Sequence, residues 1–98
     1  MRRSEVIATL RAHQSELDAL GVTSLSLFGS TARDEAGPDS DVDVLAEFDG
    51  GATFDRYMGL VLALQDWLGR RVDVVTPGAL RLKPAWRAQI EREALRVA

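Results

Sequence analysis

Two aspartates in the middle of the chain are spaced so that their carboxylates can act together. Asp41 and Asp43 lie two residues apart in a segment whose residues alternate between polar and apolar, a pattern that predicts a strand. Side chains two apart on a strand project from the same face. Two carboxylates held this close repel each other, and a divalent cation removes that repulsion. The pair therefore predicts a Mg²⁺ platform for substrate phosphates, with a solvated strand end as the alternative.

A third aspartate interrupts an apolar run further along the chain. Asp73 stands within Val-Asp-Val-Val, a segment that otherwise predicts a buried central strand. An ionised carboxylate in such a place is costly unless it is paired or bound to a metal, and Arg70 and Arg71 offer the ion-pair alternative. Beside Asp41 and Asp43, it would complete a two-metal arrangement. Such a site clamps the attacking and leaving oxygens of an in-line phosphoryl displacement.

The dipeptide Gly29-Ser30 follows a predicted strand and opens a short predicted helix. Glycine permits close approach of the backbone, and a helix N-terminus presents free N–H groups to an anion. The Ser30 hydroxyl could add a hydrogen bond to a phosphate oxygen, or it could simply cap its helix. The dipeptide is therefore a candidate phosphate-binding turn.

Helices and strands alternate along the chain and would position these residues. The apolar spacing and the capping residues predict helices over residues 4–20, 30–35, 54–68 and 84–94. Strands are predicted over residues 23–28, 41–48 and 70–76, with turn chemistry at 37–40. This alternation predicts an α/β fold in which helices pack on a small sheet.

Composition narrows the class of protein. With 98 residues, 46% of them hydrophobic and 28% charged, the chain is expected to form one folded domain over residues 1–98. A net charge of −3 argues against strong binding of nucleic acid, which needs a basic surface. The absence of cysteine excludes disulfides and thiolate metal sites. The longest apolar run, residues 60–64, is too short for a membrane span, and we expect a cytoplasmic protein.

Several conspicuous residues have simpler interpretations. His13 is the single histidine, so we expect it on the surface or in packing contacts rather than at a metal. Trp67 and Trp86 fall at helical spacing with other apolar residues, which favours packing over stacking on a base. A basic C-terminal stretch is expected to be a solvated helix face. It comprises Arg81, Lys83, Arg87, Arg92 and Arg96.

The motifs together resemble a known family. Leu-Phe-Gly-Ser-Thr-Ala-Arg at residues 27–33, Ser-Asp-Val-Asp-Val-Leu at 40–45 and Val-Asp-Val-Val at 72–75 are similar to the minimal nucleotidyltransferases. These belong to the DNA polymerase β-like superfamily and include the antitoxin halves of HEPN–MNT toxin–antitoxin pairs. The resemblance covers nearly the whole chain and implies a mixed sheet of three to four strands. One departure is Asp34, where the family often has glycine.

The resemblance also implies roles for the site residues. Asp41 and Asp43 would bind two Mg²⁺ ions and the phosphates of an NTP, and Asp73 would hold one metal and help to activate the acceptor hydroxyl. Gly29 and Ser30 would hold the triphosphate. Arg33 matches an arginine often found in this family and is expected to meet a phosphate, with a surface ion pair to Asp34 or Glu35 as the alternative.

Three hypotheses about function follow from this resemblance. In the first, the protein is a Mg²⁺-dependent enzyme that transfers a nucleoside monophosphate, AMP from ATP, to an acceptor hydroxyl; better-understood members modify a tyrosine of a partner HEPN toxin. In the second, it is a non-catalytic antitoxin that neutralises its partner by contact. In the third, it senses nucleotide without turnover. The three intact aspartates favour the first hypothesis.

Overall fold

A four-stranded sheet organises the protein in the computed structural model, which describes residues 2–35, 37 and 40–98. In chain order the strands are β1 (Val22–Phe28), β2 (Val42–Phe48), β3 (Val72–Val75) and β4 (Leu95–Arg96). The sheet order is β3-β2-β1-β4, with β1 antiparallel to both β2 and β4 and with β2 parallel to β3. The predicted α/β fold with a small mixed sheet is confirmed. Pro38 and Asp39 of the predicted turn lie outside the described residues.

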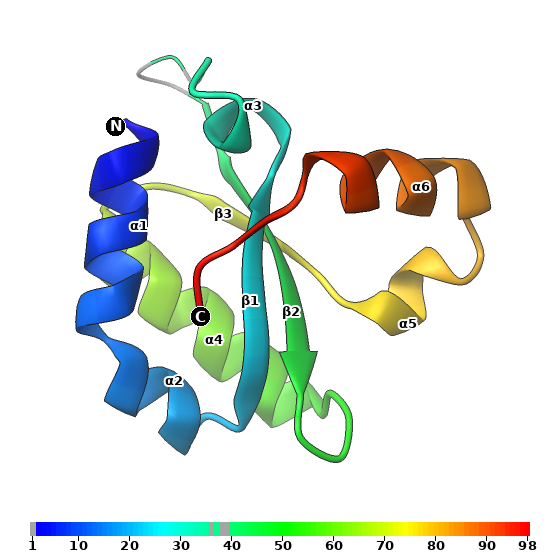
Figure 1. The fold of residues 1–98 in the computed structure, drawn as a ribbon. Helices are drawn as coiled ribbons and strands as arrows, with labels where there is room; N and C mark the ends of the chain where they lie inside the picture. Colours follow the sequence, from blue (N-terminus) through cyan, green and yellow to red (C-terminus); the bar gives the residue numbers. More distant parts are fainter. Residues whose placement is uncertain (1, 36, 38–39) are drawn as a thin grey trace.

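Three helices cover one face of the sheet (Figure 1). They are α1 (Arg3–Ala12), α2 (Gln14–Ala19) and α4 (Phe54–Leu68). Alternate residues of β2 point into this layer, where Val44 and Ala46 are fully buried with Leu60 and Leu64 of α4. Burial of this apolar surface is the main stabilising term of the fold, and it fixes which residues of β2 face the opposite side.

The N-terminal segment forms two helices where the sequence predicted one. The chain leaves helical geometry at His13, whose φ and ψ are −107° and 25°. The imidazole stacks on the indole of Trp67 with ring centroids 4.0 Å apart and planes 2° apart. Both aromatic residues therefore make packing contacts, as expected.

Helix α4 begins and ends where the sequence indicated. The Thr53 hydroxyl accepts a hydrogen bond from the backbone N–H of Arg56, which satisfies a free donor of the first turn. Gly69 ends the helix in the left-handed region with φ of 66°. The chain enters β3 at Val72, so a short turn connects α4 to β3.

The other face of the sheet carries α5 (Pro77–Leu80) and α6 (Pro84–Glu93), seen on the right of Figure 1. A smaller cluster of buried residues holds them in place, including Leu80 from α5 and Ile90 from α6 against Phe28 and Val75 of the strands. The short helix α5 was not predicted, because Pro77-Gly78 resembles a simple strand end. Strand β4 was missed because two residues are too few to show a period.

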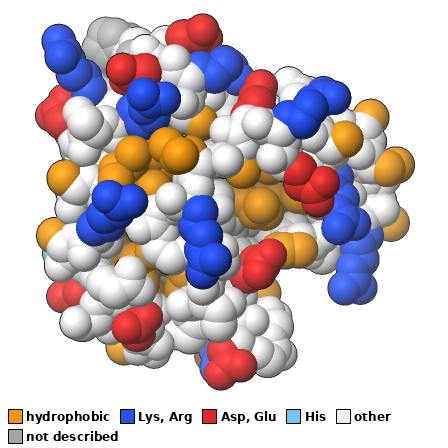
Figure 2. Space-filling view, in the orientation of Figure 1, with side chains coloured by type: hydrophobic (Ala, Val, Ile, Leu, Met, Phe, Trp, Pro, Cys, Tyr) orange, Lys and Arg blue, Asp and Glu red, His pale blue; other side chains and the backbone are white. Residues whose placement is uncertain are grey.

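Basic side chains gather at the edge of the molecule formed by α5 and α6 (Figure 2). The five basic residues of the C-terminal stretch are all exposed. They do not form the single helix face that we expected, because only Arg87 and Arg92 lie within α6 and Arg96 lies on β4. Within the described residues, every helix is too short or too polar to cross a bilayer.

Candidate active site

Asp43 and Asp73 lie side by side on neighbouring strands. In the parallel pair β2–β3, Asp43 is the direct partner of Asp73, so both side chains project from the same face. Both line a pocket of about 380 Å³ on the face that carries α6. The prediction that Asp73 lies in a buried central strand was wrong: β3 is at the edge of the sheet, and Asp73 is exposed. Its alternative ion pair with Arg70 or Arg71 is not observed; Arg71 pairs elsewhere.

The burial and the neighbouring charges in this arrangement shift the pKa of the Asp43 carboxyl group. Burial raises the pKa of Asp43 above its usual value, and the negative charges of Asp73 and Asp41 raise it further. The positive charge of Arg33 acts in the opposite direction and lowers the pKa. The like charges are therefore incompletely balanced by the protein, which is the electrostatic condition that favours a bound cation.

Asp41 stands at the rim of this group, immediately before β2. Its Oδ1 lies 3.3 Å from the Nε of Arg71, and the two side chains are 46% and 83% exposed, respectively. An ion pair this exposed contributes little stability and can be exchanged for another partner. The negative charge of Asp41 raises the pKa of Asp43, but Asp41 is not among the residues that line the pocket.

The turn from β1 into α3 (Gly29–Ala32) closes the pocket beside the aspartates. Gly29 has φ of 69°, and a Cβ added there would overlap the Oδ2 of Asp43. Only glycine allows the backbone this conformation and this proximity at once. Ser30 lies inside the first turn of α3 without a capping hydrogen bond, so the capping alternative is not observed.

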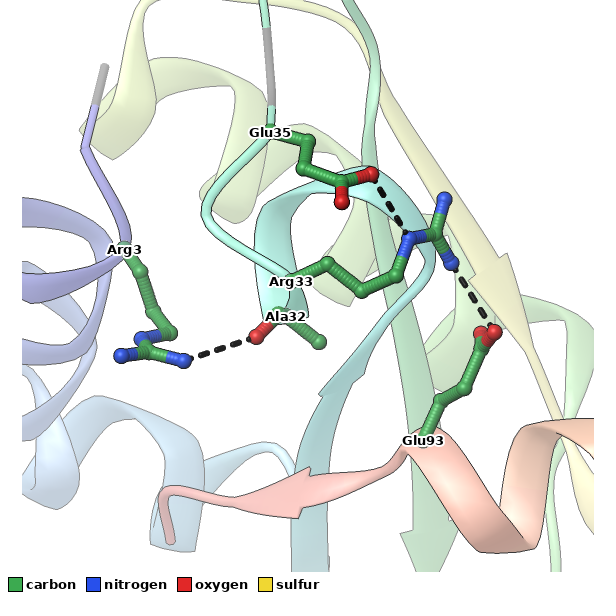
Figure 3. Close-up of polar contacts among 5 residues, drawn as sticks. All are labelled: Arg3, Ala32, Arg33, Glu35 and Glu93. Atoms are coloured by element: carbon green, nitrogen blue, oxygen red, sulfur yellow. Dashed lines mark hydrogen bonds and ion pairs between the residues drawn. The ribbon is translucent and has the colours of Figure 1, made fainter.

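Arg33 follows α3 and is held by two carboxylates (Figure 3). Its Nε donates to Oε2 of Glu35 at 3.1 Å, and its Nη1 donates to Oε1 of Glu93 at 2.9 Å. The surface ion pair with Glu35 that the sequence offered as an alternative is thus present. The pair with Glu93, sixty residues away, was not foreseen.

The loop after α3 is fixed by the N-terminal helix. Arg3 donates from Nη1 to the carbonyl oxygen of Ala32 at 3.0 Å, and its backbone N–H donates to Oδ1 of Asp34 at 3.0 Å (Figure 3 shows the first of these). Asp34 has φ of 59°, the left-handed region in which glycine is most easily accommodated. The short Asp34 side chain gains a backbone partner there, which accounts for an aspartate at a position where the sequence resemblance implied glycine.

One face of α6 forms the opposite wall of the pocket. The residues concerned recur at the spacing of a helix face: Trp86, Gln89, Ile90 and Glu93. Sequence reasoning assigned these residues to a packing or solvated helix and did not connect them with the aspartates. Their helical spacing was visible in the sequence, but nothing in it indicated which surface the helix faces.

A larger hollow of about 550 Å³ lies toward the other end of β2, between that strand and α5. Its charged lining residues are Glu47 and Arg81, and small residues form most of the remainder. Its lining has a single carboxylate, so the candidate site is the smaller pocket, where Asp43, Asp73 and Gly29 meet.

The pattern of a glycine turn beside paired strand aspartates is that of a known family. The family described as the nucleotidyltransferase domain matches residues 8–97. The chain belongs to this family. The protein adenylyltransferase MntA of Thermococcus cleftensis is 38% identical over 78 residues, which cover 79% of each chain. The expectation of a nucleotidyltransferase enzyme is confirmed.

Solved structures agree with this assignment. A structure described as a predicted minimal nucleotidyltransferase is 39% identical, has a TM-score of 0.82, and covers 97% of this chain and 95% of that one. A structure described as a toxin–antitoxin with AMP-PNP is 19% identical with a TM-score of 0.67 over 100% of this chain and 73% of that one. At that identity it supports the fold alone.

The acids of this nucleotidyltransferase suit Mg²⁺ in chemical type, because Mg²⁺ prefers carboxylate oxygens and substrate phosphates. Among the described residues, no group of three or more metal-binding side chains is arranged closely enough to hold an ion by itself. Burial raises the pKa of Asp43, the charges of Asp73 and Asp41 raise it further, and a cation would offset the repulsion among these carboxylates. In chemical type and in charge, the residues therefore fit Mg²⁺.

Proposed function

We propose that this nucleotidyltransferase uses Mg²⁺ to transfer AMP from ATP to a hydroxyl group of a partner protein. The observation that carries the proposal is the register of the parallel strands, which sets Asp43 beside Asp73 in a pocket closed by Gly29 and Ser30. The relative named protein adenylyltransferase supports AMP as the group transferred.

The residues of the pocket divide the work of an in-line displacement. Asp73 is exposed to the pocket and accepts the proton of the attacking hydroxyl, whose oxygen forms a bond to the α-phosphorus. The bond from the α-phosphorus to the bridging oxygen breaks, and pyrophosphate leaves. Gly29, Ser30 and Arg33 bind the leaving phosphates. Asp41, Asp43 and Asp73 would hold Mg²⁺, which would supply positive charge that stabilises the transition state.

The acceptor in this proposal is a tyrosine of a HEPN toxin, the protein that the chain would neutralise as an antitoxin. The resemblance of the motifs to the antitoxins of HEPN–MNT pairs motivates this choice. A structure of similar fold is described as a toxin–antitoxin with AMP-PNP, and the proposal extends that nucleotide and that kind of partner to this chain. Asp73 is exposed where it lines the pocket, so a hydroxyl group of a second protein can reach this side of the site.

The test is incubation with α-³²P-labelled ATP, Mg²⁺ and the protein encoded beside this one. We expect label on the neighbour, and at least a hundredfold less label with Asp43→Asn, because one site carboxylate contributes several kcal/mol to phosphoryl transfer. The control is Asp66→Asn, an exposed aspartate on α4 in the opposite layer. Equal transfer by wild type and Asp43→Asn would refute the assignment.

Neutralisation of the neighbour measures the contact hypothesis separately. If the protein acts by transfer, Asp43→Asn still binds its partner but no longer protects cells from it. Full protection by Asp43→Asn would identify a binding antitoxin, and nucleotide binding without pyrophosphate release would identify a sensor.

A further inference from the structure

We propose that Glu93 occupies the place of a nucleotide phosphate on Arg33, and that nucleotide binding exchanges the one for the other. This inference rests on the proposed function of the pocket and adds a residue that belongs to none of its sequence motifs. Glu93 would thereby set the affinity for the nucleotide.

The position of Glu93 is the first observation. Both Glu93 and Arg33 line the pocket, and the 2.9 Å contact between Nη1 and Oε1 joins the end of α6 to the end of α3. Figure 3 shows the guanidinium reaching from the loop after α3 to the carboxylate on α6. The Glu93 side chain is 24% exposed, against 66% for Glu35, the other partner of Arg33. Of the two partners, only Glu93 is among the residues that line the pocket, so Glu93 is the carboxylate that a nucleotide in the pocket would meet.

The charge of the pocket is the second observation. Its lining carries three carboxylates, from Asp43, Asp73 and Glu93, against the single guanidinium of Arg33. A triphosphate that approaches Arg33 from the pocket meets the Glu93 carboxylate directly. A guanidinium binds carboxylate and phosphate oxygens with the same fork geometry, so the two acids compete for one partner.

The third observation concerns how α6 is attached. Among the side-chain hydrogen bonds of the described residues, the Arg33–Glu93 contact is the one that joins α6 to another helix or strand region. The helix otherwise packs on the molecule through Ile90, which is almost fully buried, and through the partly buried Trp86. Exchange of Glu93 for a phosphate would thus loosen the wall of the pocket at the moment the nucleotide enters.

The test compares matched Glu→Gln variants on α6 by calorimetric titration with Mg²⁺ and α,β-methylene-ATP, an analogue that cannot transfer its AMP. Glu93→Gln is expected to tighten binding about three- to tenfold, the effect of removing one partly exposed charge from an ion pair. Glu91→Gln is the control: Glu91 pairs with Arg87 at 2.9 Å on the exposed side of the helix and should leave binding unchanged. Glu93→Ala, which also removes the hydrogen bond, should tighten binding at least as much.

Two further measurements separate exchange from general electrostatics. In an Arg33→Gln background, Glu93→Gln should lose most of its effect, because the two acids then have no shared partner. Inorganic tripolyphosphate with Mg²⁺, which lacks the nucleoside, should show the same tightening. An unchanged or weaker affinity of Glu93→Gln, an equal effect in both backgrounds, or tightening for the nucleotide alone would each overturn the inference.

The outcome for wild type distinguishes this inference from the proposed function. If wild type binds nucleotide and transfers label, but Glu93→Gln has the same nucleotide affinity as wild type, the exchange is refuted and the enzyme assignment stands. Absence of binding in every variant, together with absence of label transfer, overturns both.

Discussion

Replacing Asp43 by asparagine should stabilise the metal-free protein at neutral pH and remove its response to Mg²⁺. The pKa of Asp43 is raised by burial and by the neighbouring carboxylates, so the folded state holds this proton more tightly than the unfolded state. A raised carboxyl pKa means that stability falls as pH rises from the ordinary value to the raised one, and the penalty then persists at pH 7. Asparagine has no charge and carries no such penalty.

Burial of Asp43 contributes to the effect, and the part that comes from the charge of Asp73 follows from the strand geometry. Neighbouring strands lie about 4.8 Å apart. Two charges at about 5 Å repel by about 1 to 3 kcal/mol for effective dielectric constants between 80 and 20. Because Asp73 is exposed, solvent screening places the pair near the lower end, about 1 kcal/mol. In a domain of this size, that difference raises the melting temperature by about 4 to 8 °C.

The assay is thermal unfolding followed by circular dichroism, with EDTA and with Mg²⁺. In EDTA, Asp43→Asn should have a higher melting temperature than wild type at pH 7. At pH 3 the two melting temperatures should be close, because the Asp43 carboxyl group of wild type is then largely protonated in both the folded and the unfolded protein. Mg²⁺ at ten times its dissociation constant should stabilise wild type by about 1.4 kcal/mol and the variant by much less. Asp66→Asn is the matched control on the opposite layer. A lower melting temperature for Asp43→Asn in EDTA, or the same Mg²⁺ response in both proteins, would refute the electrostatic account.

Two further substitutions test the turn and the core, each against a matched partner. Gly29→Ala should lower the free energy of unfolding by about 1 to 2 kcal/mol because of the positive φ at this position, and it should abolish nucleotide binding because the new Cβ meets Asp43. Gly69 has nearly the same φ but no neighbouring atom in the way. Gly69→Ala should therefore lose stability and keep nucleotide binding. Loss of binding in both glycine variants would contradict this. Leu64→Ala, at a fully buried site, should lower the free energy of unfolding by about 2 to 5 kcal/mol in urea titration. Leu62 is 61% exposed on the same helix, so Leu62→Ala should change this free energy by less than about 0.5 kcal/mol. Equal losses in the two variants would contradict the assignment of Leu64 to the core.

The sequence by itself determined the local parts of this protein. A period of two placed Asp43 and Asp73 on strands, and glycine after an apolar strand marked the turn at Gly29, because these signals depend on neighbouring residues alone. The cap at Thr53 and the stop at Gly69 were equally legible, since helix ends are satisfied by residues within one turn. These local signals were enough to indicate the family and its reaction.

The tertiary structure alone decided which of these parts meet. The strand order places Asp73 at an exposed edge of the sheet and not in its buried centre. In the same arrangement Arg71 forms its ion pair with Asp41 and not with Asp73. The packing of α6 brought Glu93 to Arg33 across sixty residues. Contacts of this kind depend on which apolar faces cover the sheet and in what register the strands pair, and those choices are made by the whole core at once rather than by any short stretch of chain.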